Sequence, residues 1–194
     1  MTDISTGTVR KTGPRSQTFE TSSTAGTGAS PGENENLVTF VELLFFAYRD
    51  FTGEADAVLA NFGLGRAHHR VLHFINRHPG LRVADLLDIL KITKQSLARV
   101  LKELVAKGFV VQRSGELDRR ERLLHVSANG VRLAEELSNL QSTRIAKALA
   151  EAGPGSAAVA QTFLAGMIAE PERRRVERLI FDPAFGANKV KEGP

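Results

Sequence analysis

Residues 92–104 read ITKQSLARVLKEL. Thr93 is one of the residue types that cap the first turn of a helix. The apolar residues behind it recur at the spacing of one helix face: Leu97, Val100, Leu101 and Leu104. The opposite face carries Lys94, Gln95, Ser96, Arg99 and Lys102. The stretch therefore predicts a capped amphipathic helix with a basic, hydrogen-bonding outer face.

The neighbouring sequence places this helix in a larger motif. A helix is predicted to begin near Arg66 and to stop at residues 78–80 (HPG), and a short one is predicted over 83–90. Residues 109–113 and 123–126 read as strands joined by a polar stretch, which predicts a β-hairpin. This order of helices followed by a hairpin predicts a winged helix-turn-helix.

The outer face of the capped helix has the chemistry of a DNA-reading surface. An α-helix fits the major groove of B-DNA, where each base pair presents its own pattern of donors and acceptors. Gln95 and Arg99 are residue types that bind adenine and guanine edges through two hydrogen bonds, and Ser96 can contact either base. Lys94 and Lys102 lie at the margins, where phosphate contacts are expected. The alternative for each residue is an ordinary solvated helix face.

Charge is concentrated around this motif. Residues 66–126 contain 13 Lys and Arg against 6 Asp and Glu, a net charge of +7, whereas the whole chain carries +4. The remainder of the chain is therefore net acidic. A basic centre between less basic flanks is typical of a module that binds a polyanion.

The predicted hairpin tip is also charged. Its arginines are Arg119, Arg120 and Arg122, next to Asp118 and Glu121. An arginine on a thin ribbon can enter the narrow minor groove, and an adjacent carboxylate such as Asp118 can hold its guanidinium in place. Alternatively, the charges serve only to prevent edge-to-edge strand pairing.

Helical segments flank the motif on both sides. A long helix is predicted over 37–62, and its aromatic-rich face suits a core or a subunit interface: Leu37, Phe40, Val41, Leu44, Phe45, Tyr48 and Phe51. Another is predicted to follow a cap at Ser127 or Asn129 and to end at Ala152, with further helices over 156–169 and 171–180.

The expected fold is mainly α with a small β-hairpin wing, a winged helix-turn-helix plus a helical dimerisation region. The expected domains are a disordered tail (1–34), an N-terminal dimerisation helix (35–65), a DNA-binding domain (66–127), C-terminal dimerisation helices (128–182) and a flexible tail (183–194).

Several stretches resemble the MarR family of transcriptional regulators. Residues 118–123 (DRRERL) and 125–130 (HVSANG) are similar to the wing signature of that family, a D-x-R motif that leads through a strand into an S/T-x-x-G helix start. Residues 92–110 resemble its recognition helix and the exit from it. Residues 64–70 (LGRAHHR) resemble the PetP-like branch. The resemblance extends over about residues 37–180.

This resemblance implies specific roles and a partner. It implies that Arg120 enters the minor groove and that Asp118 braces it. It implies that the major groove is read by Gln95, Ser96 and Arg99. It also implies a homodimeric repressor on a palindromic operator in double-stranded DNA. Two recognition helices held about 34 Å apart discriminate between sequences far better than one. The extra C-terminal helix departs from the family pattern.

The family also implies a small-molecule effector, since its members commonly lose DNA affinity when an anionic or aromatic molecule binds beside the DNA-binding lobe. The candidate pocket residues are Phe45, Tyr48, Arg49, His69 and His73. Alternatively, these are ordinary core and surface residues. The i, i+4 spacing of His69 and His73 suits zinc, which leaves a metal-responsive regulator as a further alternative, but the ligand set is incomplete and we predict no bound metal.

Other classes of protein are disfavoured. The chain has no cysteine, and it shows no phosphate-binding glycine loop, no G-x-S-x-G elbow and no catalytic pair of carboxylates. We predict no enzymatic activity and no cofactor. No apolar run approaches the roughly 18 to 20 residues of a membrane span, so we expect a cytoplasmic protein with no membrane partner. An architectural protein that binds DNA without sequence preference stays open.

Overall fold

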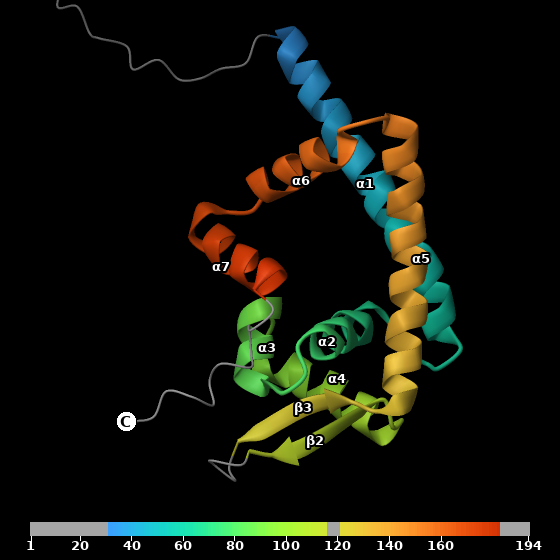
Figure 1. The fold of residues 1–194 in the computed structure, drawn as a ribbon, viewed down its shortest axis with the longest axis vertical. Helices are drawn as coiled ribbons and strands as arrows, with labels where there is room; N and C mark the ends of the chain where they lie inside the picture. Colours follow the sequence, from blue (N-terminus) through green and yellow to red (C-terminus); the bar gives the residue numbers. More distant parts are fainter. Residues whose placement is uncertain (1–30, 116–120, 183–194) are drawn as a thin grey trace, which may run out of the picture. The chain divides into compact units, whose positions relative to one another are not determined.

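The computed structural model describes residues 31–115 and 121–182 (Figure 1). Residues 1–41 and 42–194 form two separate units. The elements, in chain order, are α1 (Pro31–Ala60), α2 (Arg66–Arg77), β1 (Leu81–Arg82), α3 (Val83–Leu90), α4 (Lys94–Ala106), β2 (Val110–Ser114), β3 (Arg122–Val126), α5 (Ala128–Ala152), α6 (Ser156–Gly166) and α7 (Glu170–Phe181). The predicted class, mainly helical with a small β wing, is confirmed.

The sheet has three antiparallel strands in the order β1-β3-β2. The hairpin of β2 and β3 was predicted, whereas β1 was not. β1 contains only two residues, Leu81 and Arg82, which pair with Leu124 and Leu123. A two-residue strand is too short to show the alternation by which strands are recognised in a sequence.

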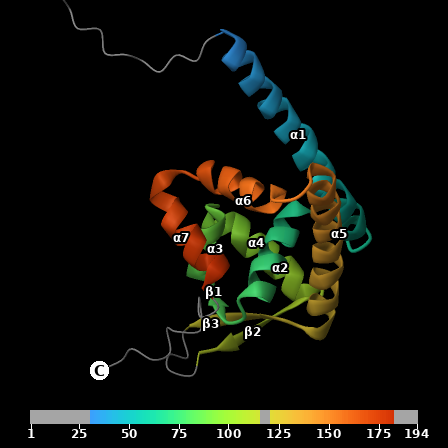
Figure 2. The same cartoon turned by 45° about the horizontal axis from the view of Figure 1, so that its top comes forward.

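The core lies where α2, α3, α4 and the first turns of α5 meet the sheet (Figure 2). Its largest fully buried side chains include Leu72, Ile75, Leu81, Leu86, Leu97, Leu104, Leu124 and Leu137. Leu97, Val100, Leu101 and Leu104 of α4 are all buried, so the predicted apolar face of this helix is confirmed. The core therefore holds the opposite, polar face of α4 toward solvent.

The first helix begins earlier than predicted. α1 starts at Pro31, inside the segment expected to be a disordered tail. Within residues 42–60, the core receives only the second half of the helix, through Thr52, Ala55 and Leu59. The first half exposes Leu43, Phe45, Phe46 and Tyr48. These aromatic side chains are therefore not part of the core of this chain. None of the helices in the described ranges is long and apolar enough to cross a bilayer.

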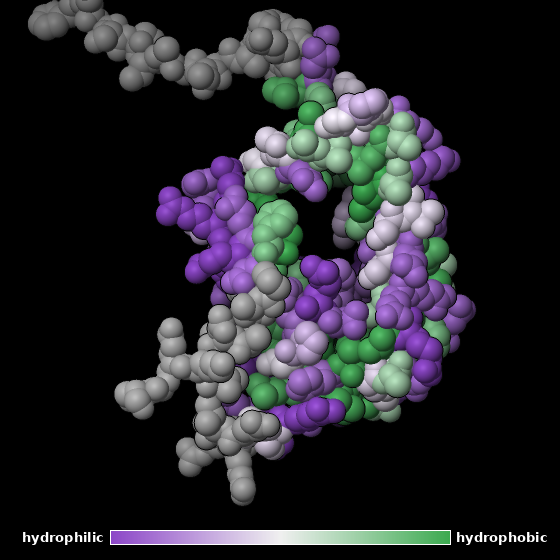
Figure 3. Space-filling view, viewed as in Figure 1, coloured by the Kyte–Doolittle hydropathy of each residue, from purple (hydrophilic) through white to green (hydrophobic). Residues whose placement is uncertain are grey.

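The predicted extra C-terminal helix is present as α7, and it docks on α3. Arg175 Nη2 lies 2.5 Å from Asp88 Oδ2, and Lys91 Nζ lies 3.0 Å from Glu172 Oε1. Leu179 is buried, whereas the outer side of α7 is hydrophilic (Figure 3). α7 therefore contacts the end of α3 and the turn that leads into α4.

Ser127 and Gly130 join the wing to α5. The Ser127 hydroxyl accepts a hydrogen bond from the Gly130 N–H (3.0 Å) and donates one to the Gly108 carbonyl (2.6 Å). Its backbone N–H donates to the Phe109 carbonyl at 3.0 Å. Of the two caps that the sequence left open, Ser127 is therefore the one used. A Cβ on Gly130 would lie 2.0 Å from the Phe109 oxygen, so this position has room only for glycine.

We expect Gly130→Ala to lower the free energy of unfolding by about 1–3 kcal/mol or more, because the added methyl group collides with backbone that cannot rotate away. Gly53→Ala is the matched control. Gly53 also lies inside a helix, but its added Cβ would meet nothing within 4 Å. There alanine should stabilise by up to about 1 kcal/mol. Urea unfolding of both variants measures the difference, and equal effects would contradict this account of the junction.

Candidate nucleic-acid interface

The predicted reading helix is capped at both ends. Thr93 Oγ1 accepts a hydrogen bond from the Ser96 N–H at 3.2 Å, which confirms the expected N-cap. At the other end Gly108 has φ +74°, and the Phe109 N–H donates to the Leu104 carbonyl at 2.9 Å. This is a Schellman-type ending, which satisfies carbonyls that the helix leaves open. α4 is therefore a well-defined 13-residue rod.

The outer stripe of α4 is exposed and unbonded. Gln95, Arg99 and Lys102 follow at i, i+4 and i+7, so they share one face. All three are exposed, and within the described part of the chain none of their side chains makes a hydrogen bond or an ion pair. Lys94 is exposed on the flank of the stripe. The helix thus presents donors and acceptors that no other described residue uses.

Ser96 differs from its neighbours on the reading helix. Its hydroxyl oxygen accepts a hydrogen bond from Thr93 Oγ1 at 2.9 Å, within the capping turn. The Ser96 proton is still available to a ligand, but the rotation of the hydroxyl is restricted. Ser96 is therefore better placed for one fixed contact than for adaptable recognition.

One flank of α4 is tied to α2 by a contact that the sequence did not reveal. His68 Nδ1 accepts from the Gly65 N–H at 3.1 Å, so Nε2 carries the proton and donates to Glu103 Oε2 at 2.9 Å. Both ring nitrogens are occupied, which removes His68 from any metal set. Among residues 31–115 and 121–182 there is no group of three His, Asp or Glu that could hold a metal ion.

The described part of the wing consists of its two strands, β2 and β3. Arg122 is exposed at the start of β3, while Asp118, Arg119 and Arg120 lie outside the described residues. Arg113 is a second exposed arginine, on β2, where it pairs through its backbone with Leu123. Sequence reasoning did not identify Arg113, because it sits in the predicted strand rather than in the charged tip. The strands of the wing therefore add basic charge to that of α4.

A cavity of about 400 Å³ lies between α1, α2 and α5. Of the five residues expected in an effector pocket, it brings together Tyr48, His69 and His73. Its other lining residues, which sequence reasoning missed, are Phe51, Thr52, Arg66, Arg70, Phe74 and Gln141. Phe45 and Arg49 do not line it. Phe45 is 70% exposed one turn before Tyr48, and Arg49 points elsewhere, pairing with Asp50 at 2.8 Å.

The cavity combines basic groups with an aromatic wall. Burial lowers the pKa of His69, and burial lowers the pKa of His73 with help from the neighbouring His69, Arg77 and His78. Both histidines are therefore neutral near pH 7. Arg66 lies over the Tyr48 ring at 5.5 Å and binds Asp56 Oδ2 at 2.6 Å.

One cavity residue, Arg70, contacts the end of α3 just before α4. The Arg70 guanidinium donates from Nη2 to the carbonyl of Leu90 at 3.4 Å. Leu90 is the last residue of α3, and the turn into α4 follows it directly. The cavity and the start of the recognition helix are thus joined by a single side chain.

Comparison with known proteins identifies relatives of this chain. The sequence pattern described as the MarR family matches residues 62–121. The HTH-type transcriptional regulator PetP of Rhodobacter capsulatus is 44% identical over 164 residues, which cover 81% of this chain and 98% of that protein.

Solved structures share the fold at low sequence identity. FabT of Streptococcus pneumoniae in complex with DNA has 16% identity and a TM-score of 0.61, covering 68% of this chain and 94% of that one. The MepR–DNA complex of S. aureus has 17% identity and a TM-score of 0.56, covering 66% and 95%. The transcriptional regulator SlyA has 15% identity and a TM-score of 0.58, covering 73% and 97%.

The exposed stripe predicts a division of labour between two neighbours on α4. Gln95→Ala should relax base preference at one position of the bound DNA, because an amide reads base edges. Lys94→Ala should weaken all sequences about equally, because phosphate contacts carry no sequence information. Selection from a randomised duplex pool measures both. Since both side chains are exposed, the melting temperature should not change, and identical selection profiles for the two variants would contradict the assignment.

Proposed function

The chain belongs to the MarR family of helix-turn-helix transcriptional regulators, and from this premise we propose that it is a sequence-specific repressor that binds operator DNA as a homodimer. The observation that carries the proposal is the stripe of Gln95, Arg99 and Lys102, which is exposed on a helix capped at both ends and makes no side-chain bond to any described residue. Two MarR-fold structures with TM-scores of 0.61 and 0.56 contain DNA, which supports the same role for this fold here.

In the proposed complex, α4 lies in the major groove. Gln95, Ser96 and Arg99 face base edges, while Lys94 and Lys102 contact phosphates. The wing follows the adjacent minor groove, with Arg119, Arg120 and Arg122 as its cations and Asp118 as the brace of Arg120. Operator DNA is the expected partner, and the cytoplasm of a bacterial cell is the expected place of action, because the chromosome lies there.

Exposed apolar residues support the homodimer. Within residues 42–182, α1 exposes Leu43, Phe45 and Phe46, α5 exposes Ile145, α6 exposes Val159 and Leu164, and Met167 is exposed just after α6. Burying such side chains gains roughly 25 cal/mol per Å² of apolar surface. A second copy of the chain would cover them and set the spacing of two recognition helices. We propose that these exposed apolar side chains form the interface within the helical regions 35–65 and 128–182, and that residues 66–127 bind DNA.

Titration against the DNA upstream of its own gene, with random DNA as competitor and at two salt concentrations, tests this function. We expect two chains per site and binding that survives the competitor. Arg120→Ala should weaken binding about tenfold or more while the dimer stays intact. Arg174→Ala, which removes the same charge from the exposed side of α7, is the control and should bind as the unaltered protein does. Equal binding of both DNAs would instead indicate an architectural protein.

We propose further that a small aromatic anion modulates DNA binding from the cavity of Tyr48, His69 and His73. Its aromatic wall suits a planar ring, and its basic groups suit a carboxylate or phenolate. The contact from Arg70 to the Leu90 carbonyl offers a route from the cavity to the turn before α4. A ligand that draws the Arg70 guanidinium toward itself would release that carbonyl.

Benzoate is a suitable probe of the cavity, because the chain has no tryptophan and Tyr48 is its only tyrosine. Binding should change the fluorescence of Tyr48. A bound anion favours the protonated forms of His69 and His73, whose pKa values burial lowers, so benzoate affinity should rise from pH 8 to pH 6. Phenol, which is neutral in this range, is the control and should show little dependence. A flat benzoate profile would contradict the assignment, and release of DNA by zinc alone would favour a metal-responsive regulator.

A further inference from the structure

Arg82 lies at the centre of a small charged cluster at the base of the wing. The two carboxylate oxygens of Asp85 accept from its Nε at 3.0 Å and from its Nη2 at 2.9 Å. Its Nη1 donates to Glu121 Oε1 at 3.1 Å. The carboxylates of Asp85 and then Glu121 raise the pKa of Arg82, so it stays charged at every pH of interest. We call these three residues the Arg82 clamp.

The clamp joins elements that are distant in the sequence. Arg82 is the N-cap residue of α3 and also part of β1, where its backbone pairs with Leu123 of β3. Arginine has no side-chain acceptor for the first turn, so it does not cap this helix in the usual way. Instead Asp85 accepts from the Arg82 backbone N–H at 3.0 Å. The guanidinium is therefore free to bridge the start of α3 and the wing.

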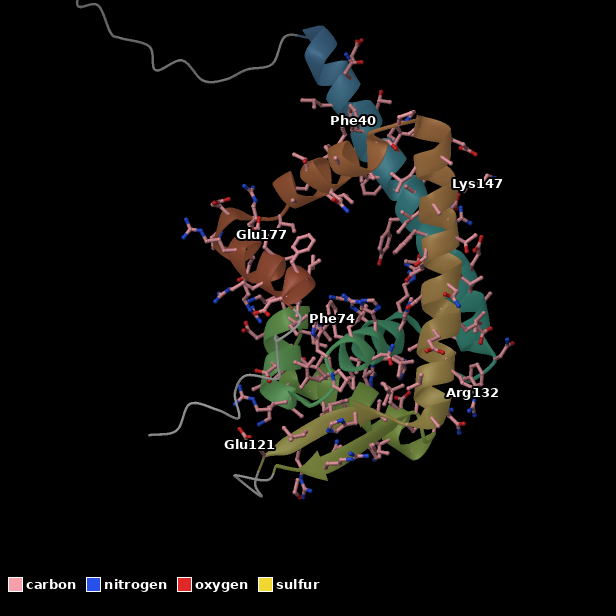
Figure 4. The ribbon with its side chains drawn as sticks, in the orientation of Figure 1. Phe40, Phe74, Glu121, Arg132, Lys147 and Glu177 are labelled. Atoms are coloured by element: carbon pink, nitrogen blue, oxygen red, sulfur yellow. The ribbon has the colours of Figure 1, made fainter. Side chains whose placement is uncertain are left out.

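Glu121 directly precedes β3 and is the first described residue after the segment 116–120. Its carbonyl accepts from the Gly115 N–H at 3.1 Å, which closes the two strands at this point. Figure 4 shows Glu121 at the outer end of β3, away from α5. Its backbone is thus held by Gly115, the residue after β2, and its side chain by Arg82. The clamp and the hydrogen bond from Gly115 together hold the residue that follows the tip.

We propose that Arg82 is a positioning residue for DNA binding, which acts through Glu121 to hold the wing in the orientation that the minor groove requires. This inference rests on the proposed function. Neither Arg82 nor Glu121 needs to touch DNA. Their contribution is the fixed angle between the wing and α4, which share the same small module.

The negative charge of Glu121 allows a positioning role to be distinguished from a purely electrostatic one. A carboxylate beside a DNA-binding wing repels phosphates, so by electrostatics alone its removal should tighten binding. If the clamp positions the wing, removal of the same carboxylate should weaken binding. The two explanations therefore predict opposite signs for one substitution. A partly exposed ion pair that served only stability would change the melting temperature slightly and DNA affinity hardly at all.

The test measures affinity of the full-length dimer for its operator in the variants Glu121→Ala, Arg82→Met and the double variant. We expect each single variant to bind about fivefold more weakly. The double variant should be no weaker than the weaker single variant, because both remove the same connection. Glu121→Gln keeps an acceptor oxygen and should recover most of the loss. Glu135→Ala removes an exposed carboxylate of α5 and should bind normally.

Hydroxyl-radical footprinting provides the readout that a purely structural role would not change. Glu121→Ala and Arg82→Met should lose the minor-groove protection that Arg120→Ala also loses, with unchanged melting temperatures. Unchanged or tighter binding by Glu121→Ala, together with a loss in Arg120→Ala, would overturn the inference and leave the proposed function standing. Full affinity and full protection in Arg120→Ala would overturn both, since the wing would then contribute nothing that a clamp could position.

Discussion

The hydrogen bonds of Ser127 are the constraint on which the arrangement of α4, the wing and α5 depends. This residue binds the carbonyls of Gly108 and Phe109, which follow the end of α4, and it caps the first turn of α5. Because Gly130 has no side chain, α5 can start against the Phe109 carbonyl. The recognition helix, the return of the wing and the helix that leaves the module are therefore fixed at one point. The S/T-x-x-G motif thus has a geometrical cause: the serine caps α5, and the glycine leaves room for the Phe109 carbonyl.

The same helix must satisfy two opposite demands. Leu97 and Leu104 are fully buried and anchor α4 to the core, while the side chains of Gln95 and Arg99 bond to none of the described residues. Unbonded polar groups cost little in water, but they would be expensive in the core. The cap at Thr93 and the Schellman ending at Gly108 complete the helix without using any group of the outer stripe. The reading face is thus rigid without being occupied.

Local patterns predicted α4 almost completely, because its cap, its apolar spacing and its terminating glycine all lie within a few residues. They did not predict the Arg82 clamp, since Arg82 and Glu121 meet only through the pairing of β1 with β3. The cavity was predicted in part. Tyr48, His69 and His73 line one cavity, but the spacing within one helix could not show which turn of α1 lies beside α2. The expected set therefore also included Phe45 and Arg49, which do not line the cavity. Contacts between distant elements are what a single sequence hides.

The turn before α4 is held from two further sides. Lys91 adopts φ +51°, a left-handed conformation that residues with a side chain seldom take. On one side of this turn, Arg70 of α2 binds the Leu90 carbonyl, and on the other, Glu172 of α7 binds Lys91. Exposed ion pairs of this kind add little to overall stability. These contacts do, however, restrict the backbone conformation of the turn at Leu90 and Lys91. The position of the turn before α4 therefore depends on both α2 and α7. A displacement of α2 would reach this turn through Arg70, and a displacement of α7 would reach it through Glu172.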